Sequence, residues 1–193
     1  MAVNLVRGQT IGLGGPDGAG PSTIRMGLGW KSVRHGFLGT LLRGGRDLDL
    51  DASALLFAGD HAEDVVYFRK LTSDDGSVVH SGDSLTGSRG QEDDEAIVVD
   101  LRRVPPRIDQ VVFTVSSFMG QRFSDVRNAF CRLVDESTGV ELARYTLAGG
   151  GDSTAQIMAK VRRQDAGWQM TAIGAPATGR TFQDLLSAIR PHL

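Results

Sequence analysis

Residues 47–57 read DLDLDASALLF, a stretch that passes from strict alternation of acidic and apolar side chains into an apolar run. Alternation with a period of two is typical of a half-buried strand. The pattern therefore predicts a strand over residues 48–57 that runs from the solvent-exposed edge of a sheet into the core. Asp47, Asp49 and Asp51 share one face of that strand, with neighbouring side chains roughly 6.5–7 Å apart.

Negative charge is concentrated in residues 47–95, the segment that begins with this strand. Between Asp47 and Glu95 there are 13 acidic and three basic side chains, a local balance of −10, although the whole chain carries only −2. Self-repulsion of that size opposes compaction unless a cation or a basic partner neutralises it. It also argues against nucleic acid as a partner of this face.

A second acidic element spans residues 81–95, SGDSLTGSRGQEDDE. It combines five carboxylates with glycines at which a backbone carbonyl can turn inward. Ca²⁺ takes roughly six to eight oxygen ligands from carboxylates, carbonyls and water, so both acidic elements suit calcium. An exposed acidic strand end and a disordered acidic loop are the alternatives. The carboxylates of the second element belong to Asp83, Glu92, Asp93, Asp94 and Glu95.

Two familiar metal motifs are excluded by their spacing. With Asp47 as the first position of an EF-hand loop, the sixth position is Ala52 instead of glycine and the twelfth is Ala58 instead of glutamate. The four histidines show no paired spacing and Cys131 is the only cysteine, so a structural zinc site is not expected. His80, beside the acidic loop, is expected to be a hydrogen-bonded scaffold residue.

Length and composition suit one domain over residues 1–193, since 40% of the residues are hydrophobic and 23% are charged. No apolar run approaches the ~18 residues that a membrane helix needs. The N-terminus becomes polar before a signal-peptide core could form. We therefore expect a cytoplasmic protein with no transmembrane segment. The single Cys131 excludes an intrachain disulfide framework and is expected to be a buried, inert thiol.

Twenty-five glycines punctuate the chain, and the short apolar stretches between them favour β-structure. Helical spacing and capping residues predict two helices, over residues 152–163 and 181–189. The elements together predict a mainly β fold, a two-sheet antiparallel β-sandwich with two short helices in the C-terminal half. Single strands are expected over residues 24–30, 97–101, 111–118 and 168–173, and hairpins from 65–68 with 78–79 and from 129–134 with 140–147.

Several of these pieces, in order along nearly the whole chain, resemble the tellurite-resistance TerD family, whose members include bacterial stress proteins and calcium-binding relatives. The opening MAVNLVRGQTIGL, the GLGW of residues 27–30 and the DLDLDASALL from Asp47 are similar to family segments. Residues 127–130, 132–134 and 143–145 match further segments. The acidic loop is similar to the family's loop through His80, Gly82, Asp83, Thr86, Gly87, Asp93, Asp94 and Glu95.

The resemblance implies a two-sheet β-sandwich whose acidic loops bind two adjacent Ca²⁺ ions, and a role in resistance to tellurite and other chemical stress. Three departures from the family pattern, Lys31 after Trp30, Ser84 and Arg89, remove an oxygen or add positive charge near the implied ions. They predict that one of the two sites is weak or lost. Carried over residue by residue, the candidate metal ligands are Asp47, Asp49, Asp51, Asp83, Asp93, Asp94 and Glu95.

Three classes of function are compatible with these carboxylates. The expected one is a calcium-binding stress-response protein without catalytic activity. The first alternative is a metal-dependent hydrolase or transferase that uses the same acidic cluster. The second is a scaffold for protein partners in a stress-resistance complex, in which calcium is structural. No nucleophile–base arrangement and no flavin or nicotinamide fingerprint is evident in the sequence, which disfavours catalysis.

Overall fold

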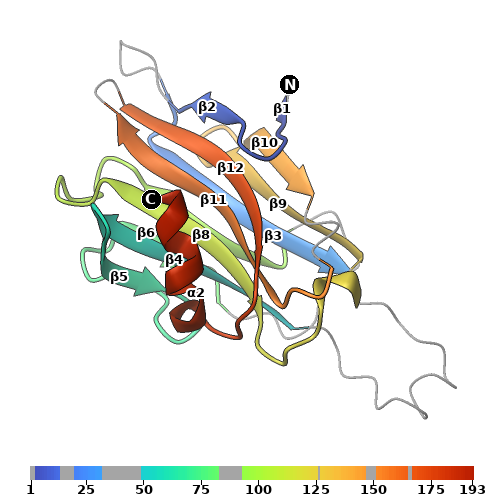
Figure 1. Cartoon of the computed structure of the whole chain (residues 1–193). Coiled ribbons are helices and arrows are strands. Elements are labelled where there is room, and N and C mark those ends of the chain that lie inside the picture. Colours follow the sequence, from blue (N-terminus) through green and yellow to red (C-terminus); the bar gives the residue numbers. More distant parts are fainter. Residues whose placement is uncertain are drawn as a thin grey trace, which may run out of the picture.

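Two β-sheets pack face to face in the computed structural model of the chain, shown in Figure 1. The structure describes residues 3–13, 20–31, 49–82, 93–125, 127–146, 151–164 and 167–193. Asp47 and Asp83 lie outside these residues, as do most of the expected loops over residues 12–21, 34–46 and 81–95.

Sheet A has the strand order β1-β10-β9-β3-β7-β6. Its neighbouring strands are antiparallel, except that β1 runs parallel to β10. The bounds are β1 Val3–Asn4, β3 Thr23–Lys31, β6 Val78–His80, β7 Glu95–Asp100, β9 Arg127–Asp135 and β10 Val140–Thr146.

Sheet B has the strand order β2-β12-β11-β8-β4-β5, and all of its neighbouring strands are antiparallel. The bounds are β2 Thr10–Gly12, β4 Leu50–Ala58, β5 His61–Val66, β8 Gln110–Ser117, β11 Ala155–Gln164 and β12 Gly167–Ala177. The two-sheet, mainly β architecture predicted from the sequence is confirmed.

The alternation in β4 separates two apolar clusters. Leu50, Ala54 and Leu56 point into the core between the sheets, where they join side chains of sheet A such as Trp30. Leu55, on the opposite face of the strand, belongs to a second cluster on the outer side of sheet B. Since successive side chains alternate across a strand, Asp51 and Ser53 share that outer face with Leu55.

Helix α2, Phe182–Ile189, covers the second cluster, and its Leu185 and Ile189 are fully buried there. The helix starts after Thr181, as the sequence predicts, and Asp184 Oδ2 accepts hydrogen bonds from the backbone N–H groups of Arg180 and Thr181. A carboxylate in this position satisfies donors that the first helical turn leaves open. None of the helices in the described ranges has the length and apolar character required to cross a membrane.

The helix predicted over residues 152–163 is wrong, because this segment forms strand β11 between β8 and β12. The register shifts between Ile157 and Ala159, a β-bulge. Met158 and Ala159 consequently both join the central core, while Ile157 faces the outer cluster. This break in the alternation gives apolar spacing that imitates a helix.

The hairpin predicted from residues 65–68 and 78–79 is also wrong. Strand β5 pairs with β4 in sheet B, and β6 pairs with β7 in sheet A, so the connection between them crosses from one sheet to the other. A single bridge between Thr72 and Val79 closes the expected turn instead. The hairpin of β9 and β10, the strands β3, β7, β8 and β12, and helix α2 are confirmed.

Cys131 lies in β9 with its side chain in the central core and no exposed surface, and burial raises the pKa of its thiol to about 12. Only the thiolate is a good nucleophile. We therefore expect iodoacetamide at about pH 8 to leave the native protein unmodified and to label it rapidly in denaturant, as measured by mass spectrometry. Rapid labelling under native conditions would contradict this buried environment.

Candidate metal centre

The two acidic segments meet where β7 begins in sheet A and β4 begins in sheet B. Glu95 Oε2 accepts a hydrogen bond of 2.8 Å from the backbone N–H of Ala52. Strand β5 pairs with β4 only as far as Ala54. Glu95 therefore binds β4 two residues beyond the point where this pairing ends. Glu95 is 1% exposed. This contact brings the second acidic segment against the first, next to Asp51.

His80 supports Glu95 from the neighbouring strand β6. Its Nε2 lies 3.5 Å from Glu95 Oε2, and both side chains are completely buried. His80 Nδ1 accepts a hydrogen bond of 3.0 Å from the backbone N–H of Gly82. With Nδ1 acting as an acceptor, the proton of a neutral ring is on Nε2, the nitrogen that lies 3.5 Å from the carboxylate. This arrangement agrees with the scaffold role expected for His80.

Asp94 is tied to the end of β3. Its backbone N–H donates to Leu28 O at 2.8 Å, and its Oδ2 accepts from the backbone N–H of Trp30 at 2.9 Å. An ionised carboxylate has about four lone-pair positions. One bond from a backbone N–H is therefore compatible with coordination of a cation by the same carboxylate.

Asp49 and Asp51 lie at the start of β4 and are shielded from water to different degrees. Asp49 is half-buried and Asp51 is 5% exposed. Oδ1 of Asp49 and Oδ2 of Asp51 have essentially no contact with solvent. Removing carboxylate oxygens from water is costly unless donors or cations surround them, so both residues suit a site that holds positive charge.

Asp93 differs from the other candidates because two arginines neutralise it. Its Oδ2 is paired with Arg25, and its Oδ1 accepts from Arg132 Nε at 2.6 Å. The Asp93 side chain is 5% exposed and lies directly on the Cα of Gly27, where any β-carbon would collide with the carboxylate. Two guanidinium groups beside this carboxylate repel a divalent cation, which argues against Asp93 as a ligand.

These ion pairs belong to a longer network on the outer face of sheet A. Arg25 Nε also donates to Glu136 at 2.6 Å, and Glu141 is bound by Arg144 at 2.6 Å and by Arg132 at 3.4 Å. The bonds from Arg144, with a smaller effect of Arg132, hold the pKa of Glu141 below its ordinary value. The network anchors Asp93 to sheet A and thereby fixes the position from which Asp94 and Glu95 continue.

Sequence analysis missed these arginine partners. Arg132 is the register partner of Gly27 across β9 and β3, and Asp93 comes from the segment that leads into β7. The alternation of basic side chains with core residues in β3 and β9 places both arginines on one outer face. Pairing them with Asp93 requires the order of the strands, which the sequence does not reveal.

The donor chemistry of the described carboxylates fits a hard cation better than a soft one. Asp49, Asp51, Asp94 and Glu95 offer oxygen only, which suits Ca²⁺. Across the described ranges, which exclude Asp47 and Asp83, no three side chains of the types His, Cys, Asp or Glu converge closely enough to hold a metal ion. The structure therefore brings the two segments together and leaves the coordination shell a prediction.

Comparisons with known proteins point to one family. A family model described as the TerD domain matches residues 1–188. The tellurium resistance protein TerZ of Serratia marcescens is 46% identical over 189 residues, which are 97% of this chain and 96% of the relative. The stress response protein SCP2 of Bacillus subtilis is 37% identical over 198 residues, covering 97% of this chain and 98% of the relative.

A solved structure shares the fold. The crystal structure of a homologue of telluride resistance protein (TerD) from Streptomyces coelicolor superimposes with a TM-score of 0.71 and covers 86% of this chain and 96% of its own. Its sequence identity to this chain is 22%. At that level of identity the similarity concerns the fold alone.

The buried position of Asp93 predicts a large effect of removing its charge. We expect Asp93→Asn to lower the free energy of unfolding by about 1–3 kcal/mol, because it removes the buried carboxylate that two guanidinium groups share. Urea denaturation measures this change. The matched control is Asp152→Asn, which also removes the partner of an arginine, but from an exposed pair with Arg122; exposed pairs contribute little. Equal effects of both variants would contradict a special role for Asp93.

Proposed function

Because the chain belongs to the TerD domain family, we propose that it is a calcium-binding protein of the tellurium-resistance and stress-response group. In this proposal it works in the cytoplasm without catalysis, as a calcium-dependent binding module or scaffold for protein partners. Relatives named for tellurium resistance and for stress response support the cellular role. The contact of Glu95 with Ala52 supports the calcium site.

The single observation that carries the calcium proposal is the convergence of two acidic segments at buried positions. Glu95 and Asp51 are 1% and 5% exposed, and Glu95 accepts a hydrogen bond from the N–H of Ala52, the residue that follows Asp51. A carboxylate that is removed from water is costly unless hydrogen-bond donors or a cation compensate it. Bound calcium would supply that positive charge and link the loops. The residues proposed to hold up to two ions are Asp47, Asp49, Asp51, Asp83, Asp94 and Glu95.

Asp93 is left out of this set, because its ion pairs with Arg25 and Arg132 give it a different task. In the proposal it anchors the chain just before Asp94 and Glu95. Lys31, Ser84 and Arg89, which depart from the family pattern, weaken one of the two ion positions.

Calorimetric titration of the metal-free protein with Ca²⁺ tests the proposal. We expect saturable binding and a higher melting temperature, since a ligand that binds only the native state at 100 times its dissociation constant stabilises by about 2.7 kcal/mol. If millimolar calcium produced no heat of binding and left the melting temperature unchanged, the proposal would be refuted.

Amide variants test the ligand assignment. Asp49→Asn and Asp94→Asn keep the size of the side chain and one acceptor oxygen but remove its charge. Each is expected to weaken calcium binding at least about tenfold, or about 1.4 kcal/mol, with a small effect on the melting temperature in chelator. Asp152→Asn, remote in the sequence and exposed, is the control. Wild-type calcium affinity in both variants would remove these residues from the site.

Substrate screening separates the proposal from the metal-dependent hydrolase. Phosphoester and glycosyl substrates are incubated with the protein in Mg²⁺ or Mn²⁺. Turnover that disappears in Asp49→Asn would support the hydrolase and contradict a non-catalytic role. Pull-down of partners with and without chelator then distinguishes a calcium-dependent module from a scaffold in which calcium is only structural.

A further inference from the structure

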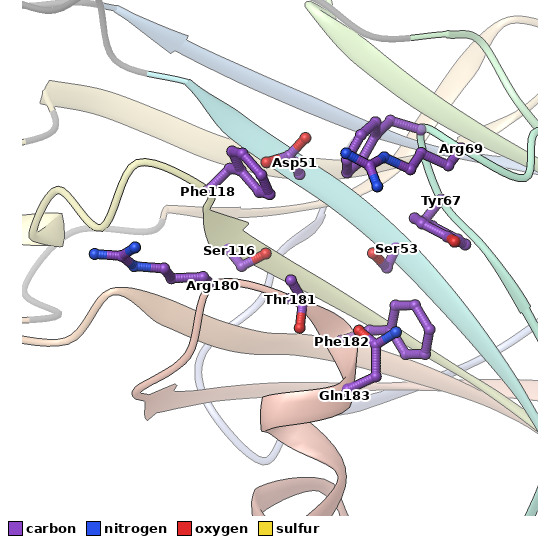
Figure 2. Close-up of a pocket in the computed structure, with 11 residues that line it drawn as sticks. Asp51, Ser53, Tyr67, Arg69, Ser116, Phe118, Arg180, Thr181, Phe182 and Gln183 are labelled. Carbon is purple, nitrogen blue, oxygen red and sulfur yellow. The ribbon is translucent and has the colours of Figure 1, made fainter.

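A pocket opens on the outer face of sheet B, next to the start of α2 (Figure 2). Its volume is about 100 Å³, well below the roughly 300–1,000 Å³ of sites for drug-sized ligands. Strands β4 and β8, the segment that follows β5 and the residues that lead into α2 all contribute to its walls. The size of the pocket suits a small organic group.

Three buried polar side chains form the floor of this pocket. Asp51, Ser53 and Ser116 are 5%, 4% and 3% exposed. Asp51 and Ser116 are direct register partners across β4 and β8, and Ser53 follows two residues later on the same face. Figure 2 shows the hydroxyl oxygens of both serines directed toward the space between them. Neither hydroxyl makes a hydrogen bond with any residue in the described part of the chain.

Aromatic rings form the sides of the pocket. Phe118, Phe68, Tyr67 and Phe182 follow one another with centroid separations of 5.9, 5.6 and 5.0 Å. Phe118 is 38% exposed although it is a large apolar residue. Aromatic faces carry negative charge density and attract cations as well as apolar groups.

We propose that this pocket binds the primary ammonium group of a small alkylamine. An ammonium has three N–H donors, and the floor offers three acceptors, one each from Asp51, Ser53 and Ser116. In the calcium-free protein the Asp51 carboxylate compensates the positive charge, and the alkyl chain packs on Phe68 and Phe118. The segment between Asp47 and Glu95, with its charge of −10, attracts cations to this side of the protein.

An anionic ligand is less compatible with the same pocket. Asp51 on the floor repels it, so that an anion would reach only the rim, where Arg69 and Arg180 are exposed. Arg69 stacks over Phe68 with 5.2 Å between its guanidinium carbon and the ring centroid. In Figure 2 the guanidinium of Arg180 points away from Ser53. The buried part of the pocket therefore selects a donor with positive charge.

Three probes of equal chain length test the charge requirement. Butylammonium, butanol and butyrate are titrated into the protein in chelator and in a buffer without primary amines, with two-dimensional NMR as the readout. We expect saturable shifts at the pocket for butylammonium, binding at least about tenfold weaker for butanol, and no binding for butyrate. Equal affinity for butanol, or preferred binding of butyrate, would overturn the proposal. Because chelator is present throughout, a failure of the calcium proposal does not affect this test.

Variants test the position of the site. Ser53→Ala and Ser116→Ala each remove one acceptor and are expected to weaken butylammonium binding about fivefold or more. Phe118→Ala removes an exposed ring and is expected to do the same without loss of the fold, which circular dichroism checks. Ser124→Ala, an exposed serine outside the pocket, is the control and is expected to bind as wild type does. Unchanged affinity in the two floor variants and in Phe118→Ala would overturn the assignment.

Discussion

The bond from the Ala52 N–H to Glu95 Oε2 joins the two sheets at the end of the sandwich where the acidic residues gather. Most contacts between the sheets are apolar and have no direction, but this one specifies a single position for each strand. It also satisfies the Ala52 N–H, which lies just beyond the pairing with β5. A buried backbone donor without an acceptor would destabilise the fold. The placement of the acidic segments, and hence any metal site built from them, depends on this bond.

Three consecutive acidic residues leave this point in three directions. Asp93 lies on the outer face of sheet A against Gly27 and two arginines, Asp94 turns to the backbone of β3, and Glu95 enters the interior. Adjacent carboxylates that each have a different environment avoid mutual repulsion. A run of acids in a sequence therefore gives no measure of how many of them share one ligand.

Regular alternation and capping were enough to predict most of the fold. Strand β8 is buried throughout, and Thr181 marks the start of α2. Strand β11 was not predictable in the same way, because its bulge at Ile157 changes which residues face the core, and only the flanking strands reveal it as β. The acidic elements of the candidate site were evident from charge. Arg25 and Arg132 pair with Asp93 and so separate it from the other acidic residues. These arginines lie on β3 and β9, whose pairing is known only from the order of the strands in the sheet.

Helix α2 has a consequence for chains that are truncated near the C-terminus. The apolar face of β4, β8 and β11 that contains Leu55 and Ile157 is completed by strands that all precede residue 182, whereas its cover is α2 itself. A chain that ends before the helix would keep every strand of the sandwich but leave this second surface in contact with water. Such an exposed apolar sheet face is a substrate for chaperones and for aggregation.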